Sequence, residues 1–277
     1  MLRRSALALG VALAVTTAFG APGAARGQLP IFDAHIHYSR PDWDAYTPER
    51  ALSILARAGV HRALVSSTPD DGTLELYRRA PKAIVPFLRP YRTSEDRHDG
   101  WTRNPQVAAH VEQRLQRGVH RGIGEIHLSV DEAGDPVVRR IAALAAEGGL
   151  FVQVHVDQTA LERLLTLYPK VRLLWAHAGM SASAETVGRL LDRHPMLWVE
   201  LALRSDVADG ARLDPVWRAL FLKHPDRFLV GTDTFTTSRW ESVAASVAAV
   251  QAWLTDLPRA VAEQIAFKNG DRLFPPP

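Results

Sequence analysis

The chain has 277 residues, of which 33 are Lys or Arg and 30 are Asp or Glu, and it has no cysteine, so disulfides, thiolate metal ligands and a cysteine nucleophile are excluded. Arg3, Arg4 and Arg26 lie in a stretch without acidic residues, so residues 27–277 carry 30 charges of each sign. Without a basic surplus, nothing in the composition favours nucleic acid or an anionic membrane as a partner.

Residues 1–26 have the pattern of a secretory signal peptide. Arg3 and Arg4 precede an apolar stretch from Ser5 to Phe19, and small residues follow. The apolar stretch is shorter than the ~20 residues that a spanning helix needs. We therefore expect cleavage and export to the periplasm or the medium, with no stable membrane anchor. The arginine pair also permits the twin-arginine route.

The remainder, residues 27–277, alternates short apolar segments with amphipathic ones. Strands are predicted near 31–37, 62–67, 83–88, 122–127, 150–155, 172–177, 197–202 and 227–233. Helices are predicted near 48–58, 72–80, 105–117, 136–147, 158–168, 183–193, 213–223 and 239–255. This alternation predicts a single-domain α/β protein, a (β/α)8 TIM barrel, and the length matches the ~250 residues typical of that fold. A doubly wound open sheet is the alternative, but it would not gather the ends of distant strands so readily.

The first predicted strand carries His35 and His37. Alternate side chains of a strand share a face, so these imidazoles project together and can hold one divalent ion. Taken alone, the pair is equally compatible with two polar residues at a strand end.

Three further ligand-type residues, His155, His177 and Asp233, each end a predicted strand. In a barrel the carboxyl ends of the strands surround one cavity, so we expect a metal site there with one or two ions. Glu125 on the fourth strand either bridges two metals or orients a ligand histidine. We expect His127 to face substrate or to be hydrogen-bonded.

Asp233 is our first choice as general base, because a carboxylate can coordinate through one oxygen and accept a proton from water through the other. His177 is either a second ligand in a two-metal site or a group that polarises a substrate carbonyl. Arg89 and Arg204 follow the third and seventh strands, where they either bind a substrate carboxylate or phosphate or form salt bridges.

Other polar and aromatic residues are less specific. Glu200 on the seventh strand either bonds inside the barrel or positions substrate. Loop aromatics are expected to wall an apolar pocket, and two other tryptophans to pack between helices and barrel: Trp43, Tyr91 and Trp101 in the first group, Trp175 and Trp217 in the second. Five histidines are expected to be solvated surface residues: His61, His110, His120, His194 and His224.

Together these motifs resemble the amidohydrolase superfamily of metal-dependent barrel hydrolases, in particular its amidohydrolase-related branch. The resemblance rests on six segments that span most of the chain: Phe32–His37, Gly122–His127, His155, Trp175–Gly179, Gly231–Asp233 and Asn269–Phe274. It implies that His35, His37 and Asp233 bind the more buried metal, that His155 ligates the same ion or a second one, and that His177 is a ligand or electrophilic catalyst. The implied metal is divalent, often zinc. The fourth strand offers no lysine for carboxylation, which leaves Glu125 as a bridge, as in the TatD-like branch, or a mononuclear site.

The resemblance and the site residues predict an exported metal-dependent hydrolase that uses metal-activated water. Its expected substrate is a small molecule with an amide, lactone, ester or phosphoester bond. A metal-dependent decarboxylase is the alternative, and a catalytically silent secreted binding protein is less favoured because the ligand set is complete. The sequence is compatible with a homo-oligomer.

Overall fold

The computed structural model describes residues 27–98 and 100–277, so the predicted signal peptide lies outside the described residues. Eight strands run parallel in chain order: β1 (Ile31–Ile36), β2 (Val60–Ser66), β3 (Ile84–Leu88), β4 (Gly122–His127), β5 (Phe151–His155), β6 (Arg172–Trp175), β7 (Leu197–Glu200) and β10 (Phe228–Leu229). The ring closes between β10 and β1, where Asp33 and Val230 form a parallel bridge and Ala34 N donates to Val230 O over 2.8 Å. The predicted TIM barrel is confirmed.

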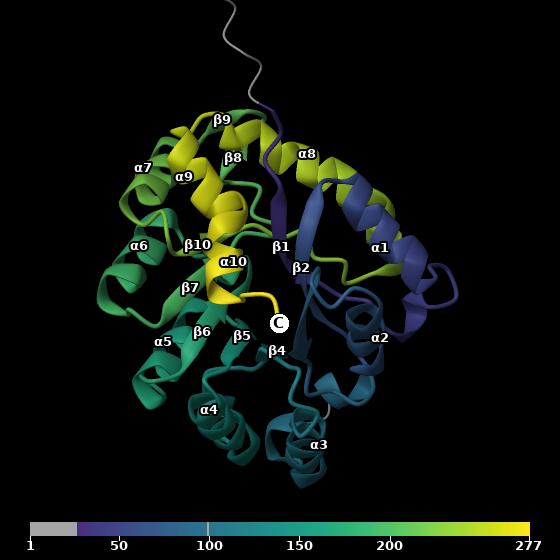
Figure 1. Ribbon diagram of the computed structural model, residues 1–277. Helices are drawn as coiled ribbons and strands as arrows, with labels where there is room; N and C mark the ends of the chain where they lie inside the picture. Colours follow the sequence, from purple (N-terminus) through teal and green to yellow (C-terminus); the bar gives the residue numbers. More distant parts are fainter. Residues whose placement is uncertain (1–26, 99) are drawn as a thin grey trace, which may run out of the picture.

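Helices surround the strands, as Figure 1 shows. The main ones are α1 (Pro48–Arg57), α2 (Asp71–Arg79), α3 (Pro105–Leu115), α4 (Pro136–Gly148), α5 (Gln158–Leu167), α6 (Ala184–Arg193), α7 (Pro215–Lys223) and α8 (Val243–Leu254). Their starts follow the sequence signals. Thr47, for example, accepts a hydrogen bond from Arg50 N, while Pro48 begins the first turn of α1. No helix within the described ranges is long and apolar enough to cross a membrane.

Short 3-10 turns occupy several loops: η1 (Arg40–Asp42), η2 (Glu95–Arg97), η3 (Trp101–Arg103), η4 (Asp131–Gly134), η5 (Ala176–Gly179) and η6 (Thr237–Ser242). A two-stranded hairpin was not expected from the sequence: β8 (Ala208–Asp209) and β9 (Arg212–Leu213). Strands of two residues are too short to show an alternating pattern.

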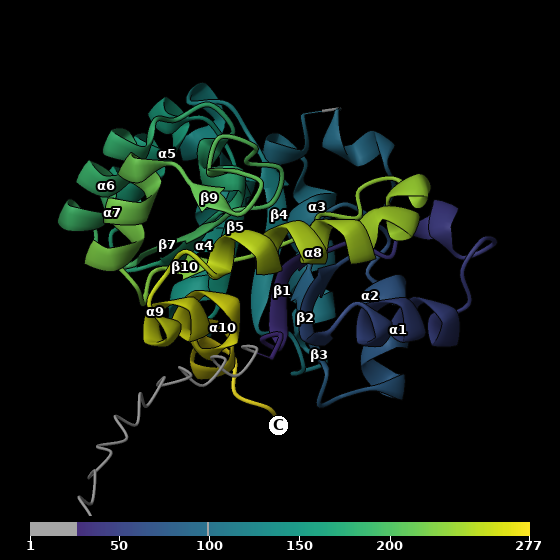
Figure 2. The same cartoon turned by 90° about the horizontal axis from the view of Figure 1, so that it is seen from above.

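The C-terminal segment was also missed as secondary structure. It forms α9 (Arg259–Glu263), a π-helical turn η7 (Gln264–Lys268) and α10 (Asn269–Leu273). A π turn interrupts the 3.6-residue period on which a sequence-based prediction depends. Figures 1 and 2 show these helices across one end of the barrel.

Phe274 closes that end. Its ring centroid lies 5.9 Å from Phe32, 5.5 Å from Phe87 and 4.9 Å from Phe151, and these residues belong to alternate strands. Gly270 permits this packing, because a Cβ there would lie 2.1 Å from Cγ of Phe32. The apolar plug leaves the opposite, carboxyl end of the strands for chemistry.

The tryptophan predictions for the barrel wall hold. Trp175 and Trp217 are both buried, at 0% and 2% exposure. Trp175 donates from its indole nitrogen to Val156 O, and Trp217 packs against Phe221 and Phe228.

Candidate metal centre

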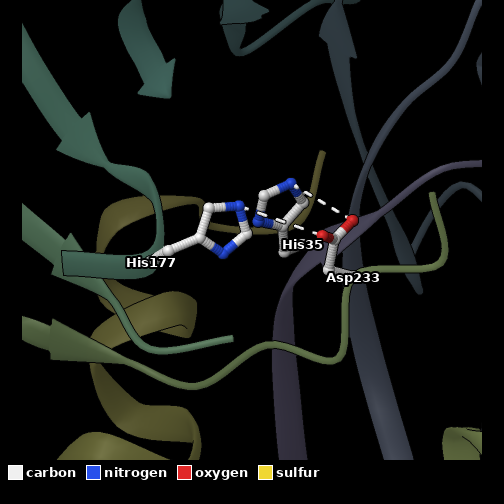
Figure 3. Close-up of side chains that lie close together, drawn as sticks. All are labelled: His35, His177 and Asp233. Carbon is white, nitrogen blue, oxygen red and sulfur yellow. Dashed lines mark ion pairs between the residues drawn. The ribbon is translucent and has the colours of Figure 1, made fainter. Parts of the chain in front are cut away.

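Four of the predicted ligands meet at the carboxyl end of the barrel. His35 and His37 lie at the end of β1, His177 lies in the turn after β6, and Asp233 follows β10. The ring of His35 is 5.0 Å from that of His37 and 4.8 Å from that of His177. Figure 3 shows His35, His177 and Asp233 pointing toward one another.

The atoms that face the centre of this group have no hydrogen-bond partner among the described residues. They are Nε2 of His35, His37 and His177 and Oδ1 of Asp233, all buried. Asp233 Oδ1 lies 3.3 Å from Nε2 of His37 and 3.7 Å from Nε2 of His35, and its Oδ2 lies 3.9 Å from Nε2 of His177. The ligand atoms of His35, His177 and Asp233 all lie within 4.8 Å of one another, and those of His35, His37 and Glu125 form a second such set. Unpaired buried polar atoms are costly, so atoms gathered in this way need a common partner. Imidazole nitrogens and a carboxylate oxygen suit a divalent metal such as zinc.

The opposite nitrogen of each histidine is held by an acceptor. Nδ1 of His35 donates to Glu200 Oε2 over 2.8 Å, Nδ1 of His177 donates to Ala202 O over 3.0 Å, and Nδ1 of His37 donates to Ser66 O. Carbonyl and carboxylate oxygens only accept, so each ring carries a proton on Nδ1 and turns Nε2 inward, the atom that can bind a metal once it is unprotonated. Metal-ligating histidines are typically oriented in this way.

Backbone strain is concentrated at the same place. Asp233 has φ 54° and His177 has φ 55°, a left-handed conformation that is uncommon for residues other than glycine. Asp233 is fixed in it by three bonds: its N donates to His35 O over 2.8 Å, and Arg239 donates to Asp233 O over 2.5 Å and to Thr232 O over 2.7 Å. Such strain persists only where surrounding contacts determine it, and it is enriched at functional sites.

Negative charge surrounds His35. Burial opposes its charged form, but Asp233, Glu125 and Glu200 together raise the pKa of His35 well above its ordinary value. Burial works against ionisation of Asp233, but His35 and His37 hold the pKa of Asp233 well below its usual range. This concentration of carboxylates favours a cation at the centre.

Glu125 lies between the inner histidines and the mouth of the barrel. Its Oε1 is 3.5 Å from Nε2 of His35 and 3.4 Å from Nε2 of His177, while Oε2 is 3.5 Å from Nε2 of His37. Oε1 also accepts from His155 Nδ1 over 2.8 Å. Glu125 is thus within reach of an ion held by the inner histidines, and it orients His155, whose side chain is 33% exposed.

His127 is hydrogen-bonded through its neighbours. Its backbone N donates to the Tyr91 hydroxyl over 2.9 Å, and its carbonyl accepts from the Trp101 indole over 2.9 Å. Burial, reinforced by Arg89, lowers the pKa of His127 to about 3, so its ring is neutral at physiological pH. His127 Nε2 lies 3.6 Å from Glu125 Oε2.

The two predicted substrate-binding arginines differ. Arg89 donates from Nη2 to Glu125 Oε2 over 3.0 Å and from Nε to Glu125 O over 3.4 Å. Arg204 is fully engaged: it bonds Asp206 through Nε and Nη2 and the carbonyls of His177, Ala178 and Ala182 through Nη1 and Nη2. Arg204 therefore braces the loop after β6, and of its two expected roles, substrate contact or salt bridge, it forms the salt bridge, to Asp206.

Two sequence expectations are corrected. Of the three loop aromatics expected at the pocket, Tyr91 lines the mouth cavity, whereas Trp101 is buried and donates to His127 O, and Trp43 packs against Tyr38. His120 is not a surface residue: its Nε2 lies 3.1 Å from Asp70 and its side chain is buried. The cause is strand stagger, since Ser66 pairs with Phe87 and Phe87 with Gly122, which brings the start of β4 level with the end of β2. His61 is exposed, as expected, and the other three are half-buried: His110, His194 and His224.

Several residues around the centre were missed or left undecided. Glu200 turns out to bond inside the barrel, and Arg239 was not considered. Asp33 accepts from the Thr232 hydroxyl over 2.7 Å and from His35 N over 3.0 Å, and burial raises the pKa of Asp33 to about 7. The sequence offers one local signal for these residues: Asp33 lies two residues before His35 and so shares its face of the strand. No sequence pattern around Arg239 indicates that it supports the site.

Comparisons with known proteins agree with this geometry. The family model described as Amidohydrolase matches residues 32–275. A search of curated proteins finds no match. Similar solved structures include an uncharacterised TIM-barrel protein from Bordetella bronchiseptica, with 14% identity, TM-score 0.62 and coverage of 88% of this chain and 97% of that one.

Two more are a probable 2-pyrone-4,6-dicarboxylic acid hydrolase from Acinetobacter baumannii and an amidohydrolase from Burkholderia multivorans. The first has 13% identity and TM-score 0.58, the second 17% and 0.56, and each alignment covers 89% of this chain and 99% of the other. At such identities these structures show the fold, while the family match covers most of the chain. The chain belongs to the amidohydrolase family.

Proposed function

We propose that this protein is an exported metal-dependent hydrolase that cleaves an amide, lactone, ester or phosphoester bond in a small molecule with activated water. The observation that carries the proposal is the convergence of three unpaired Nε2 atoms and one unpaired carboxylate oxygen, each held in place from behind. The Acinetobacter baumannii neighbour is named as a hydrolase, which supports the same reaction class.

The side chains have distinct roles in this proposal. His35, His37, His177 and Asp233 would hold the ion, for which zinc fits the donor set. When bound, such an ion acts as a Lewis acid and lowers the pKa of water to ≈ 7. Asp233 accepts the proton of the attacking water at Oδ2, because Oδ1 faces the ligand nitrogens of β1. Neutral His127 donates to the substrate carbonyl from Nε2.

Decarboxylation is the second candidate, and one observation favours it. Both oxygens of Glu125 already accept a hydrogen bond, Oε2 from Arg89 over 3.0 Å and Oε1 from His155 over 2.8 Å, whereas a bridging carboxylate would use both oxygens as metal ligands. This pairing favours one ion rather than two. A single ion keeps the carbon–carbon lyase reaction as a candidate beside hydrolysis, whereas a bridged pair would favour hydrolysis.

The test is a product assay on zinc-loaded protein. Lactones, amides, esters, phosphoesters and unsaturated or aromatic acids are supplied, and acid release and carbon dioxide are measured separately. Asp233→Asn should abolish turnover without changing the circular dichroism spectrum. The surface variant Asp192→Asn should keep both the turnover and the spectrum of wild type. Full activity in Asp233→Asn would remove Asp233 from its role, and carbon dioxide as the product would favour the lyase.

Export is proposed from residues 1–26 alone. Expression of the full chain in a Gram-negative host should yield a periplasmic protein whose first residue lies close to Gly27. Cytoplasmic retention of the uncleaved chain would contradict this part of the proposal.

A further inference from the structure

A cavity of about 760 Å³ opens at the mouth of the barrel, above β1, β2 and β3. Its lining comes from the loops that follow these strands and from Phe235, and its charged residues include Arg40, Asp44, Arg89, Arg92 and Arg97. The volume falls within the ≈ 300–1,000 Å³ of small-molecule sites. Resting on the proposed function, we propose that this cavity binds an oxyanion of the substrate, a carboxylate or a phosphate, on Arg89.

Arg89 is the charged group at the inner end of this cavity. Its side chain is 9% exposed. Nε and Nη2 are both directed to Glu125, at 3.4 Å from its carbonyl and 3.0 Å from Oε2. Nη1 makes no hydrogen bond within residues 27–98 and 100–277, and it is not among the buried unpaired atoms, so it faces the open cavity. An arginine whose third nitrogen points into a cavity is suited to an oxyanion.

Arg204 shows that a buried arginine near the mouth of the barrel does not always have a nitrogen free of hydrogen bonds. It is 9% exposed, almost the same as Arg89, but every one of its nitrogens is bonded to Asp206 or to a backbone carbonyl. Of these two buried arginines, only Arg89 has a donor to offer.

The position of Arg89 connects the cavity to the metal centre. Glu125 Oε2 accepts from Arg89 and lies 3.5 Å from Nε2 of His37. An oxyanion on Nη1 would therefore lie next to Glu125 and close to the proposed ligand set. It would fix one end of a substrate while the bond to be cleaved reaches the ligands.

The rest of the lining describes the ligand further. Four arginines and one aspartate face the cavity, so the charge of the lining is positive and attracts anions. Pro41, Pro69 and Phe235 add apolar surface, and Phe235 is 56% exposed. The matching ligand is a small acid with an apolar body.

Isothermal titration calorimetry on the zinc-loaded protein tests this inference with benzoate, its neutral counterpart benzamide, and inorganic phosphate. We expect wild type to bind benzoate or phosphate, and Arg89→Gln to weaken that binding about tenfold because a charged hydrogen bond is lost. Benzamide should be insensitive to the substitution. Whichever of the two anions depends on Arg89 identifies the oxyanion as carboxylate or phosphate.

The control is Arg259→Gln, which removes an exposed arginine that lies outside the cavity and is paired with Glu263 at 2.7 Å. It should change affinity by about twofold or less, as expected for an exposed charge. Arg89→Lys keeps the positive charge and replaces the glutamine variant in the experiment if that variant does not fold. It should retain part of the affinity for the anion. Equal affinity in wild type and both Arg89 variants, or no binding of either anion by wild type, would overturn the inference. A wild-type chain that takes up no metal would instead contradict the proposed function.

Discussion

Glu200 Oε2 accepts a hydrogen bond from Nδ1 of His35 over 2.8 Å, and neither side chain is exposed to solvent. The same oxygen lies 3.2 Å from His177 N, so one carboxylate supports two of the proposed ligands. Gly231 makes room for it, because a Cβ at that position would lie 2.3 Å from Glu200 Oε1. Glu200 thus sets the orientation and tautomer of His35 without facing the ion.

Replacing Glu200 with glutamine should lower zinc affinity about 10–100-fold, the usual effect of removing a support of a metal-ligating histidine. The amide keeps the size of the side chain but removes its charge and one acceptor. Competition with a chromophoric chelator measures the affinity. Glu112→Gln, which alters an exposed pair with Arg140, is the control, and equal affinity in the two variants would refute the role of Glu200.

Arg239→Ala should also weaken metal binding, by about tenfold, because Arg239 holds the carbonyls of Thr232 and Asp233 and thereby fixes the left-handed Asp233. The absorption spectrum of the cobalt-substituted protein should change as well, since the position of one ligand becomes less defined.

Arg227→Ala is a matched control for that experiment. Arg227 likewise donates to two carbonyls, those of Leu197 and His194, and stacks on Trp198, but it contacts none of the proposed ligands. Both variants should lose thermal stability, and only Arg239→Ala should alter metal affinity and the cobalt spectrum. Identical spectra in the two variants would show that Arg239 is merely structural.

His110 on α3 predicts a pH effect on stability. Burial, with Arg114 nearby, lowers the pKa of His110 below its ordinary value of 6.5, and its Nε2 is buried without a partner among the described residues. A depressed folded-state pKa means that the unfolded chain takes up the proton first, so stability is full above pH about 6.5 and falls below it. His110→Gln should therefore lose less melting temperature between pH 7 and pH 5 than wild type. Exposed His98→Gln is the control, and a variant that tracks wild type would disprove the effect.

Phe274→Ala should destabilise the barrel by about 3–5 kcal/mol, as expected when a buried aromatic ring is removed. Phe274 contacts Phe32, Phe87 and Phe151 at the closed end. Urea unfolding measures the change, with half-exposed Leu222→Ala for comparison. A loss as small as that of Leu222→Ala would show that the end of the chain does not contribute to the core.

The barrel and its inner ligands could be predicted because their signals are local. His35 and His37 share a face through the two-residue period of one strand, and His177 and Asp233 follow the ends of others. The residues that hold these ligands in place could not be predicted from local sequence patterns. Glu200 and His35 are 165 positions apart, and their pairing depends on which strands of the closed barrel face each other across its interior.

Arginine roles were the least predictable part. Arg89 and Arg204 follow strands in the same manner, and their sequence contexts do not separate them. What separates them is the set of acceptors in reach: Glu125 leaves one nitrogen of Arg89 open, while Asp206 and three carbonyls saturate Arg204. That difference arises from loop conformation, which a residue pattern does not encode.

Elemental analysis of the purified protein shows whether the converging histidines and Asp233 hold a metal. We expect at least one divalent ion per chain, with most of it lost in His35→Ala and all of it retained in His61→Ala, which changes an exposed histidine outside the ligand set. A second ion that disappears in Glu125→Gln would establish a bridged pair. Wild type that binds no divalent metal after loading with zinc, manganese, cobalt, nickel or iron, or a His35→Ala variant with undiminished metal, would contradict the account.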